Sequence, residues 1–185
     1  MPLKRPQTLS SDSISKNPYW EYRLDSYTLP NGGHGEYHYV HTRGAAMVVA
    51  LDNDGKLILV KQVRYLLKRE SIEFPGGGVK GDDSLLSAKD ELAEEAGFGA
   101  ANWELAGEFD PYNGVTDEIC KVDLATGLKE AAKEKDPSEE FEVLKLTVDE
   151  FQSMVDGGEI WDGMTLAAWG LAKKTVLHNL KEVVR

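Results

Sequence analysis

Short segments in which apolar residues run together or alternate with polar ones occur along most of the chain, separated by glycine, proline and aspartate. A continuous apolar run spans residues 44–51, which is typical of a strand buried on both faces. The turn at 52–55 leads into a strand over 56–65, where Gln62 and Arg64 lie on the same, polar face. Shorter alternating runs predict further strands at 71–75, 103–109, 117–124 and 141–146. Helical spacing predicts two helices near the C-terminus, over 148–155 and 162–180, so the chain has an α/β pattern.

The N-terminal part differs in composition from the rest. Residues 1–18 are polar and rich in serine and proline, which predicts a flexible arm. Aromatic and polar residues then alternate within 19–43, and a strong turn signal at 30–33 predicts a β-hairpin. Residues 44–185 contain no internal repeat and are expected to form one domain.

Residues 74–98 combine a glycine run with an acidic helix, predicted over 84–96. Glu91, Glu94 and Glu95 are spaced i, i+3 and i+4, so they lie on one face of that helix. The last two stand near the helix C-terminus, where negative charge is unfavourable. Carboxylates that bind a hard cation such as magnesium or calcium would explain this placement. A solvated acidic face is the simpler alternative.

Composition limits the classes of partner. The 185-residue chain is 41% apolar and 29% charged, as ordinary globular proteins are. Its net charge of -11 and its lack of a basic stripe argue against nucleic acid and anionic membranes as partners, while a metal ion still permits a small anionic substrate. The one cysteine, Cys120, excludes an intramolecular disulfide and indicates a reducing compartment. Because no apolar run approaches the ~18 residues of a membrane-spanning helix, a cytoplasmic protein is expected.

Residues outside the acidic helix carry weaker signals. Arg64 suits bidentate recognition of a phosphate, but an arginine near a strand end is also an ordinary surface residue. Trp20 and Tyr22 are able to stack on a nucleobase, and they are equally able to pack a sheet or a dimer contact. These residues by themselves leave both readings open.

The stretch from Gly76 resembles the Nudix box, whose pattern is G-x5-E-x7-R-E-U-x-E-E-x-G-U with U an apolar residue. Gly76 is in register with the leading glycine, and residues 91–98 (E-L-A-E-E-A-G-F) match the second half. Two positions depart from the pattern. Asp82 stands where the family has glutamate, and Asp90 stands where it has the arginine that normally braces the glutamates.

The resemblance covers about residues 20–175 and points to the ADP-ribose pyrophosphatase and nucleotide-sugar hydrolase branch of the family. It is carried by the runs R-G-A-A-M-V-V-A-L, E-F-P-G-G, F-D-P-Y-N-G-V-T-D-E-I-C and G-G-E-I-W-D-G-M-T-L-A-A. The implied fold is an α/β/α sandwich with a mixed β-sheet and an N-terminal β-hairpin extension. The branch also implies a homodimer with exchanged N-terminal strands, a role that fits residues 19–43.

The resemblance further implies a metal site and a general base. The metal, Mg²⁺ or Mn²⁺, would be held by the carbonyl of Gly76 and by the three box glutamates, Glu91, Glu94 and Glu95. The candidates for the catalytic base are two glutamates on the loop before the last strand, Glu139 and Glu140, and alternatively the box glutamates Glu94 and Glu95.

The same likeness implies substrate-binding residues. Arg64 would contact a phosphate, while Gln62 and Glu73 would shape the site. Glu118 would meet the distal sugar. Trp20 or Tyr22 would stack on the base.

The predicted function is metal-dependent hydrolysis of the pyrophosphate bond of a nucleoside diphosphate sugar. ADP-ribose is the first expected substrate, which gives AMP and ribose 5-phosphate. One alternative is a Nudix hydrolase that acts on another pyrophosphate, such as a dinucleotide polyphosphate or a modified nucleotide. A second is a non-catalytic Nudix-like ligand sensor.

Overall fold

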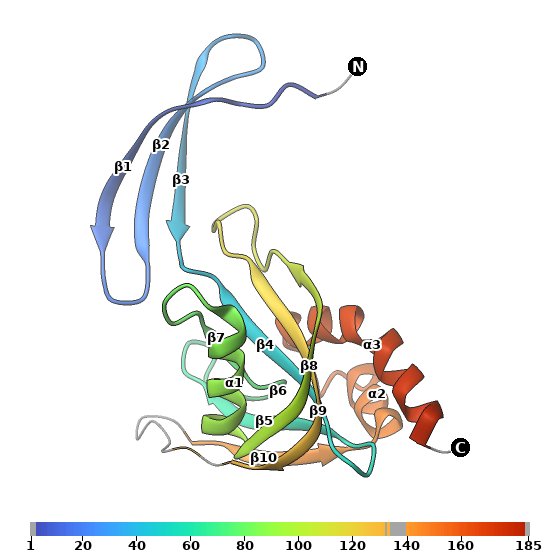
Figure 1. Cartoon of the computed structure of the whole chain (residues 1–185). Helices are drawn as coiled ribbons and strands as arrows, with labels where there is room; N and C mark the ends of the chain where they lie inside the picture. Colours follow the sequence, from blue (N-terminus) through green and yellow to red (C-terminus); the bar gives the residue numbers. More distant parts are fainter. Residues whose placement is uncertain (1–2, 132, 134–139, 184–185) are drawn as a thin grey trace. The chain divides into compact units, whose positions relative to one another are not determined.

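The computed structural model describes residues 3–131, 133 and 140–183 (Figure 1). The chain divides into two compact units, Met1–Arg43 with Asp110–Glu118 and Gly44–Phe109 with Ile119–Arg185. The segment 110–118, which was expected within the domain 44–185, groups with the N-terminal unit. Within the described residues, no helix is both long and apolar enough to cross a membrane.

The first unit contains a three-stranded antiparallel sheet in the order β1-β2-β3: β1 (Thr8–Lys16), β2 (Glu21–Thr28) and β3 (His34–His41). The predicted hairpin is therefore present. The expectation of a flexible arm is wrong for Thr8–Lys16, because these residues pair with β2 over the whole strand. Their serine-rich sequence shows no apolar period, and every residue of β1 is exposed, so the strand is specified by backbone pairing rather than by burial.

The second unit is built on a mixed seven-stranded sheet. Its main path is β10-β5-β4-β9-β8, with β6 paired to β5 and β7 paired to β4. The pairing of β4 with β9 is parallel, and the other pairings are antiparallel. The strands are β4 (Ala45–Leu51), β5 (Leu57–Arg64), β6 (Arg69–Glu73), β7 (Gly76–Gly78), β8 (Phe98–Phe109), β9 (Cys120–Glu130) and β10 (Glu142–Leu146).

Helices cover both faces of this sheet, which gives three layers (Figure 1). The helix α1 (Ser84–Glu95) lies on one face, and α2 (Val148–Asp156) and α3 (Gly163–Val183) lie on the other. Alternate residues of β4 enter the two cores, with Met47 and Val49 on the α2/α3 side and Val48 on the α1 side. The continuous apolar run of β4 is thus explained by burial on both faces, as predicted.

Local sequence signals account for the helix ends. Asp83 caps α1, and its side chain accepts a hydrogen bond of 3.0 Å from the backbone N–H of Leu86. Gly97 follows the helix with a φ of 78°, a left-handed conformation that glycine adopts without strain. Thr147 and Glu150 form a capping box at the start of α2.

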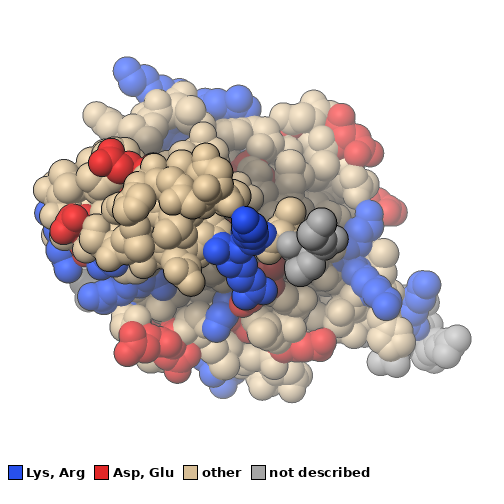
Figure 2. All heavy atoms as spheres, turned by 90° about the horizontal axis from the view of Figure 1, so that it is seen from above, with Lys and Arg blue, Asp and Glu red and all other residues tan. Residues whose placement is uncertain are grey.

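Charged side chains of both signs are interspersed on the face of the molecule seen in Figure 2. Lys and Arg side chains stand among acidic and uncharged residues there rather than forming one continuous basic stripe.

Candidate active site

The glycine strand β7 brings the backbone close to the acidic helix α1. The N–H of Gly76 donates a hydrogen bond of 3.0 Å to Oε2 of Glu95. A Cβ atom on Gly77 would lie 2.7 Å from Oε1 of Glu91, which is closer than real Cβ contacts allow. A carboxylate of α1 therefore contacts the backbone at each of these two glycines, and at Gly77 a larger residue would displace it.

The carboxylates of Glu91 and Glu94 share one cation. The Nζ atom of Lys80 lies 3.3 Å from Oε1 of Glu91 and 3.1 Å from Oε2 of Glu94. Burial lowers the pKa of Lys80, but the contacts with the two glutamates outweigh it, so the pKa stands above its ordinary value. Glu91 and Glu95 are 8% and 5% exposed, whereas Glu94 stands further out on the helix face.

The side chains on the acidic face of α1 are carboxylates, the ligand type that a divalent cation prefers. Among the described residues, no three His, Cys, Asp or Glu side chains are arranged to hold a metal ion. The carboxylates of Glu91 and Glu94 nevertheless both contact the ammonium of Lys80. The third carboxylate, that of Glu95, accepts a hydrogen bond from the N–H of Gly76. Oxygen ligands of this kind are those that Mg²⁺ and Mn²⁺ take.

Arg64 and Glu73 form the second part of the site. The guanidinium of Arg64 donates from Nε to Oε1 of Glu73 over 2.8 Å and from Nη2 to Oε2, a bidentate pair. Glu73 is 2% exposed, so it orients the arginine from the protein interior. The hydrogen bond to Glu73 raises the pKa of Arg64, and the charges of Asp162 and Glu95 add to this effect. The arginine therefore stays charged near the acidic helix.

A hollow of about 570 Å³ joins Arg64 to two other predicted residues. Gln62 and Glu140 line it, together with Lys61 and Tyr65. This volume is within the range of small-molecule sites. The structure thus groups Gln62 and Arg64, which belong to β5, with Glu140, which lies just before β10. Glu139, the other base candidate, lies outside the described residues.

Neither departure from the box pattern leaves a defect in the described structure. Asp82 is exposed, and the capping role beside it belongs to Asp83. Asp90 forms an ion pair with Lys133, a residue 43 positions later, whose N–H also donates to the carbonyl of Ala93. The position that holds arginine in the family pattern is thus used here to attach the segment after β9 to α1.

The remaining predicted residues belong to the first unit. Glu118 accepts a hydrogen bond from Oγ1 of Thr42 over 3.3 Å, and burial raises its pKa. Tyr22 stacks on His38 and its hydroxyl lies 2.8 Å from Nδ1 of that ring, while Trp20 is 43% exposed. The described contacts of Glu118 and Tyr22 lie within the first unit.

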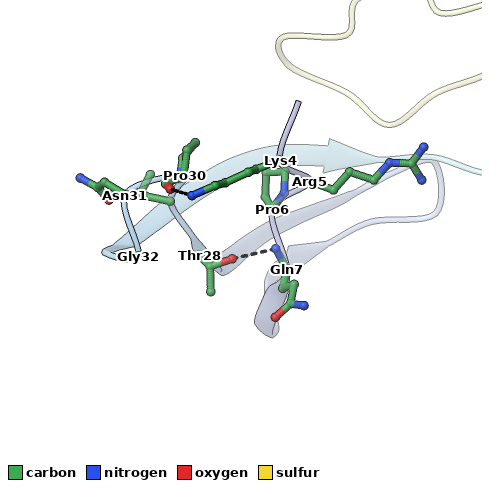
Figure 3. Close-up of a pocket in the computed structure, with 9 residues that line it drawn as sticks. Lys4, Arg5, Pro6, Gln7, Thr28, Pro30, Asn31 and Gly32 are labelled. Atoms are coloured by element: carbon green, nitrogen blue, oxygen red, sulfur yellow. Dashed lines mark hydrogen bonds between the residues drawn. The ribbon is translucent and has the colours of Figure 1, made fainter. Parts of the chain in front are cut away.

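The first unit also has a hollow of about 350 Å³, which no predicted site residue lines (Figure 3). The Nζ atom of Lys4 donates to the carbonyl of Pro30 over 3.0 Å, and the N–H of Gln7 donates to Oγ1 of Thr28. The side chains of Lys4 and Arg5 point in opposite directions (Figure 3). The two cations do not converge, so this hollow does not form an anion site of the kind built by clustered basic residues.

Sequence reasoning missed two basic residues, Lys80 and Lys133. Lys80 lies in the unspecified part of the box between its glycine and its first acid, and Lys133 lies in a charged stretch read as a loop. The available signal was charge balance, since an acidic helix face that is not fully solvated needs nearby cations. The sequence contains several lysines near the box, so this signal did not select one.

The chain is similar in sequence and in fold to several known proteins. Residues 41–166 match the NUDIX domain. The chain is 32% identical over 165 residues to an ADP-ribose pyrophosphatase of Bacillus subtilis (strain 168), covering 88% of this chain and 89% of that protein. It is 34% identical over 136 residues to an ADP-ribose pyrophosphatase of Mycobacterium tuberculosis, covering 72% and 66%.

Two further similarities extend over nearly the whole chain. A methanol dehydrogenase activator of Bacillus methanolicus is 32% identical over 169 residues, covering 90% of this chain and 91% of that protein. A crystal structure of an ADP compounds hydrolase superposes with a TM-score of 0.82 at 17% identity, covering 97% and 98% of the two chains. At that identity the structural likeness concerns the fold.

Proposed function

The chain belongs to the NUDIX family, and from this premise we propose that it hydrolyses the pyrophosphate bond of a nucleoside diphosphate sugar. ADP-ribose is the first candidate, with AMP and ribose 5-phosphate as products. The observation that carries the proposal is the convergence of two box carboxylates, Glu91 and Glu94, on one cation, while the third, Glu95, interacts electrostatically with Arg64. Two relatives named ADP-ribose pyrophosphatase, 32% and 34% identical, support the choice of substrate.

Glu91, Glu94, Glu95 and the carbonyl of Gly76 are the proposed ligands of Mg²⁺ or Mn²⁺. When bound, such a metal neutralises the pyrophosphate and lowers the pKa of a water molecule that attacks phosphorus. The protein contributes the position of the carboxylates, because α1 is capped by Asp83 and held against β7 by the Gly76–Glu95 hydrogen bond.

Arg64 is the proposed phosphate ligand. Its hydrogen bonds to Glu73 use Nε and Nη2, so Nη1 is directed elsewhere and can donate to a phosphate oxygen. Gln62 belongs to the same strand and lines the hollow, where its amide is able to donate or accept a hydrogen bond. Glu140, on that wall too, is a candidate to take the proton from water, with Glu139 and the box glutamates as the other candidates.

Residues of the first unit are proposed to recognise the ends of the substrate. Glu118 would accept a hydrogen bond from the distal sugar, and Trp20 or Tyr22 would stack on the base. We also propose a homodimer that involves the N-terminal strands. A reducing compartment such as the cytoplasm is the proposed location, because the chain contains a single cysteine, Cys120, which is fully buried.

The proposal is tested by a hydrolysis screen with Mg²⁺ over ADP-ribose, other nucleotide sugars, dinucleotide polyphosphates and nucleoside triphosphates. The expected result is turnover of nucleotide sugars, with a nucleoside monophosphate and a sugar phosphate identified as products. Strong turnover of triphosphates without any of nucleotide sugars would assign the chain to another substrate class. No turnover of any of them, with binding retained, would favour a ligand sensor.

The Glu95→Gln variant tests the metal role of the box. Because removal of a ligand charge weakens both metal binding and transition-state stabilisation, we expect hydrolysis to fall by about 100-fold or more. The matched control is Glu104→Gln, which removes an equal charge from an exposed position on β8. Unchanged hydrolysis in Glu95→Gln would refute the role of this residue.

A further inference from the structure

Lys80 contacts two of the box glutamates, although the box pattern specifies no residue type at its position. It lies in the loop between β7 and α1, and its ammonium contacts Glu91 at 3.3 Å and Glu94 at 3.1 Å. Its backbone is fixed to the helix, because the N–H of Lys80 donates to Oγ of Ser87 over 2.9 Å. Oγ of Ser87 in turn donates to the carbonyl of Asp83. The loop is therefore anchored, while the side chain is 59% exposed and free to change rotamer.

The charges around Lys80 explain why an ammonium is found there. Glu91 and Glu94 stand at i and i+3 on α1, where like charges repel. A cation between them removes this repulsion and satisfies oxygen atoms of the largely buried Glu91. A divalent metal ion held by the same two carboxylates needs these oxygen atoms too, so the ammonium and the metal exclude each other.

We propose that Lys80 occupies the metal position in the metal-free protein and is displaced when the metal binds. This inference rests on the proposed metal site. Lysine suits the role, because its ammonium is a point charge on a flexible stem that leaves without breaking a bidentate contact. The residue stabilises the empty acidic site and, by competition, weakens the binding of the metal.

The opposite role is a permanent brace, which is what the family's arginine provides at the position of Asp90. A brace would hold the carboxylates in place with the metal bound, so its loss would weaken metal binding. If the metal instead displaces Lys80, loss of the lysine removes a competitor and strengthens metal binding. The sign of the change in metal affinity therefore separates the two roles.

The test is isothermal titration of Mg²⁺, and separately of Mn²⁺, into metal-free wild type, Lys80→Met and Lys80→Gln. We expect both variants to bind the metal roughly 3- to 30-fold more tightly, the factor expected when two partly exposed ion pairs no longer compete. Without metal, both variants should melt a few degrees lower than wild type, because Glu91 and Glu94 lose their shared cation. The metal-induced rise in melting temperature should be larger than in wild type.

Lys89→Met is the matched control. Lys89 is an exposed residue of the same helix and lies 5.7 Å from the ring of Trp103, so its removal makes an equal change in net charge away from the glutamates. Equal tightening in Lys89→Met, or unchanged or weaker binding in the Lys80 variants, would overturn the inference while leaving the metal site intact. Absence of any metal binding in wild type would overturn the metal site itself and the inference with it.

Discussion

At the scale of single residues, the site depends on the absence of side chains as much as on their presence. Gly76 and Gly77 carry no Cβ at positions where one would collide with the backbone carbonyl of Ala46 and with the carboxylate of Glu91. The two collisions differ in kind. The carbonyl belongs to the paired strand β4 and is not able to move, whereas the carboxylate is the end of a flexible side chain. Substitution at Gly77 should therefore affect function more than stability.

We predict that Gly77→Ala displaces the carboxylate of Glu91 and lowers metal affinity and hydrolysis by about 10-fold or more, the cost expected when a ligand is no longer oriented. Its melting temperature should stay within a few degrees of wild type, because Glu91 only needs to adopt another rotamer. The measurements are thermal melting without metal and titration with Mg²⁺.

The control for this substitution is the next residue. A Cβ atom on Gly78 would meet nothing within 4 Å, so Gly78→Ala should retain metal affinity. A large loss in both alanine variants, or in neither, would show that the contact between Gly77 and Glu91 does not position the carboxylate.

At the scale of elements, α1 combines a buried apolar face with the acidic face that forms the site. Ala88, Leu92 and Ala96 pack into the core beneath the sheet. Glu94 and Glu95 stand in the last turn, which opposes the helix dipole. The stability of the helix therefore depends on its N-cap and on its buried face. Loss of the N-cap should destabilise the whole helix, including the turn that carries the glutamates.

We predict that Asp83→Ala destabilises the protein by about 0.5–2 kcal/mol, the usual cost of losing an N-cap. The side chain of Asp83 accepts from the N–H of Leu86, and alanine leaves that donor without its partner. Urea denaturation measures the change. The control, Asp82→Ala, removes the same charge one residue earlier at an exposed position without a cap, and it should change stability by no more than about 0.5 kcal/mol. Equal losses in both would attribute the effect to charge.

At the scale of the whole molecule, the two units differ in how much they bury. The three-layer unit has two apolar cores, one on each face of its sheet. In the N-terminal sheet, β1 is exposed throughout, and Glu21 is the one residue of the three strands that is buried. A small sheet gains independent stability from an apolar face or from packing against another element. A second copy of the chain would supply that contact, which is why we propose a dimer through these strands.

Light scattering coupled to size-exclusion chromatography should give a mass twice the 20.5 kDa of one chain. Leu9 and Ile14 are the large apolar residues of β1, and they are 49% and 53% exposed. We expect the double variant Leu9→Glu/Ile14→Glu to shift the mass toward that of a monomer, since burial of introduced charges in an interface is unfavourable.

The matched variant for this test is Ser10→Glu/Ser15→Glu, which adds the same two charges to the same exposed strand without removing apolar side chains. It should shift the mass less. A monomeric wild type at all concentrations would refute the dimer, and an equal shift in both variants would assign the effect to charge.

Most elements of the fold were predictable because their signals are local. The double-sided burial of β4, the capping box of Thr147 and Glu150 and the glycine stop after α1 each depend on residues a few positions apart. The prediction was wrong for β1, since a strand without an apolar period is specified by its partner. The strand predicted over 117–124 ends too early, because β9 pairs with β8 past the apolar residues and continues to Glu130.

By itself, the sequence determined the box, the helix that aligns Glu91, Glu94 and Glu95, and the family to which the chain belongs, because these depend on residue identity and spacing along one element. The tertiary structure alone decided which cation each acid meets. Lys80 lies between the two glutamates, Arg64 pairs with Glu73, and Lys133 reaches Asp90 from 43 residues away. Such pairs depend on where strands and loops bring side chains in space. The sequence contains many lysines and acids that satisfy the same local rules, and only the packing selects among them.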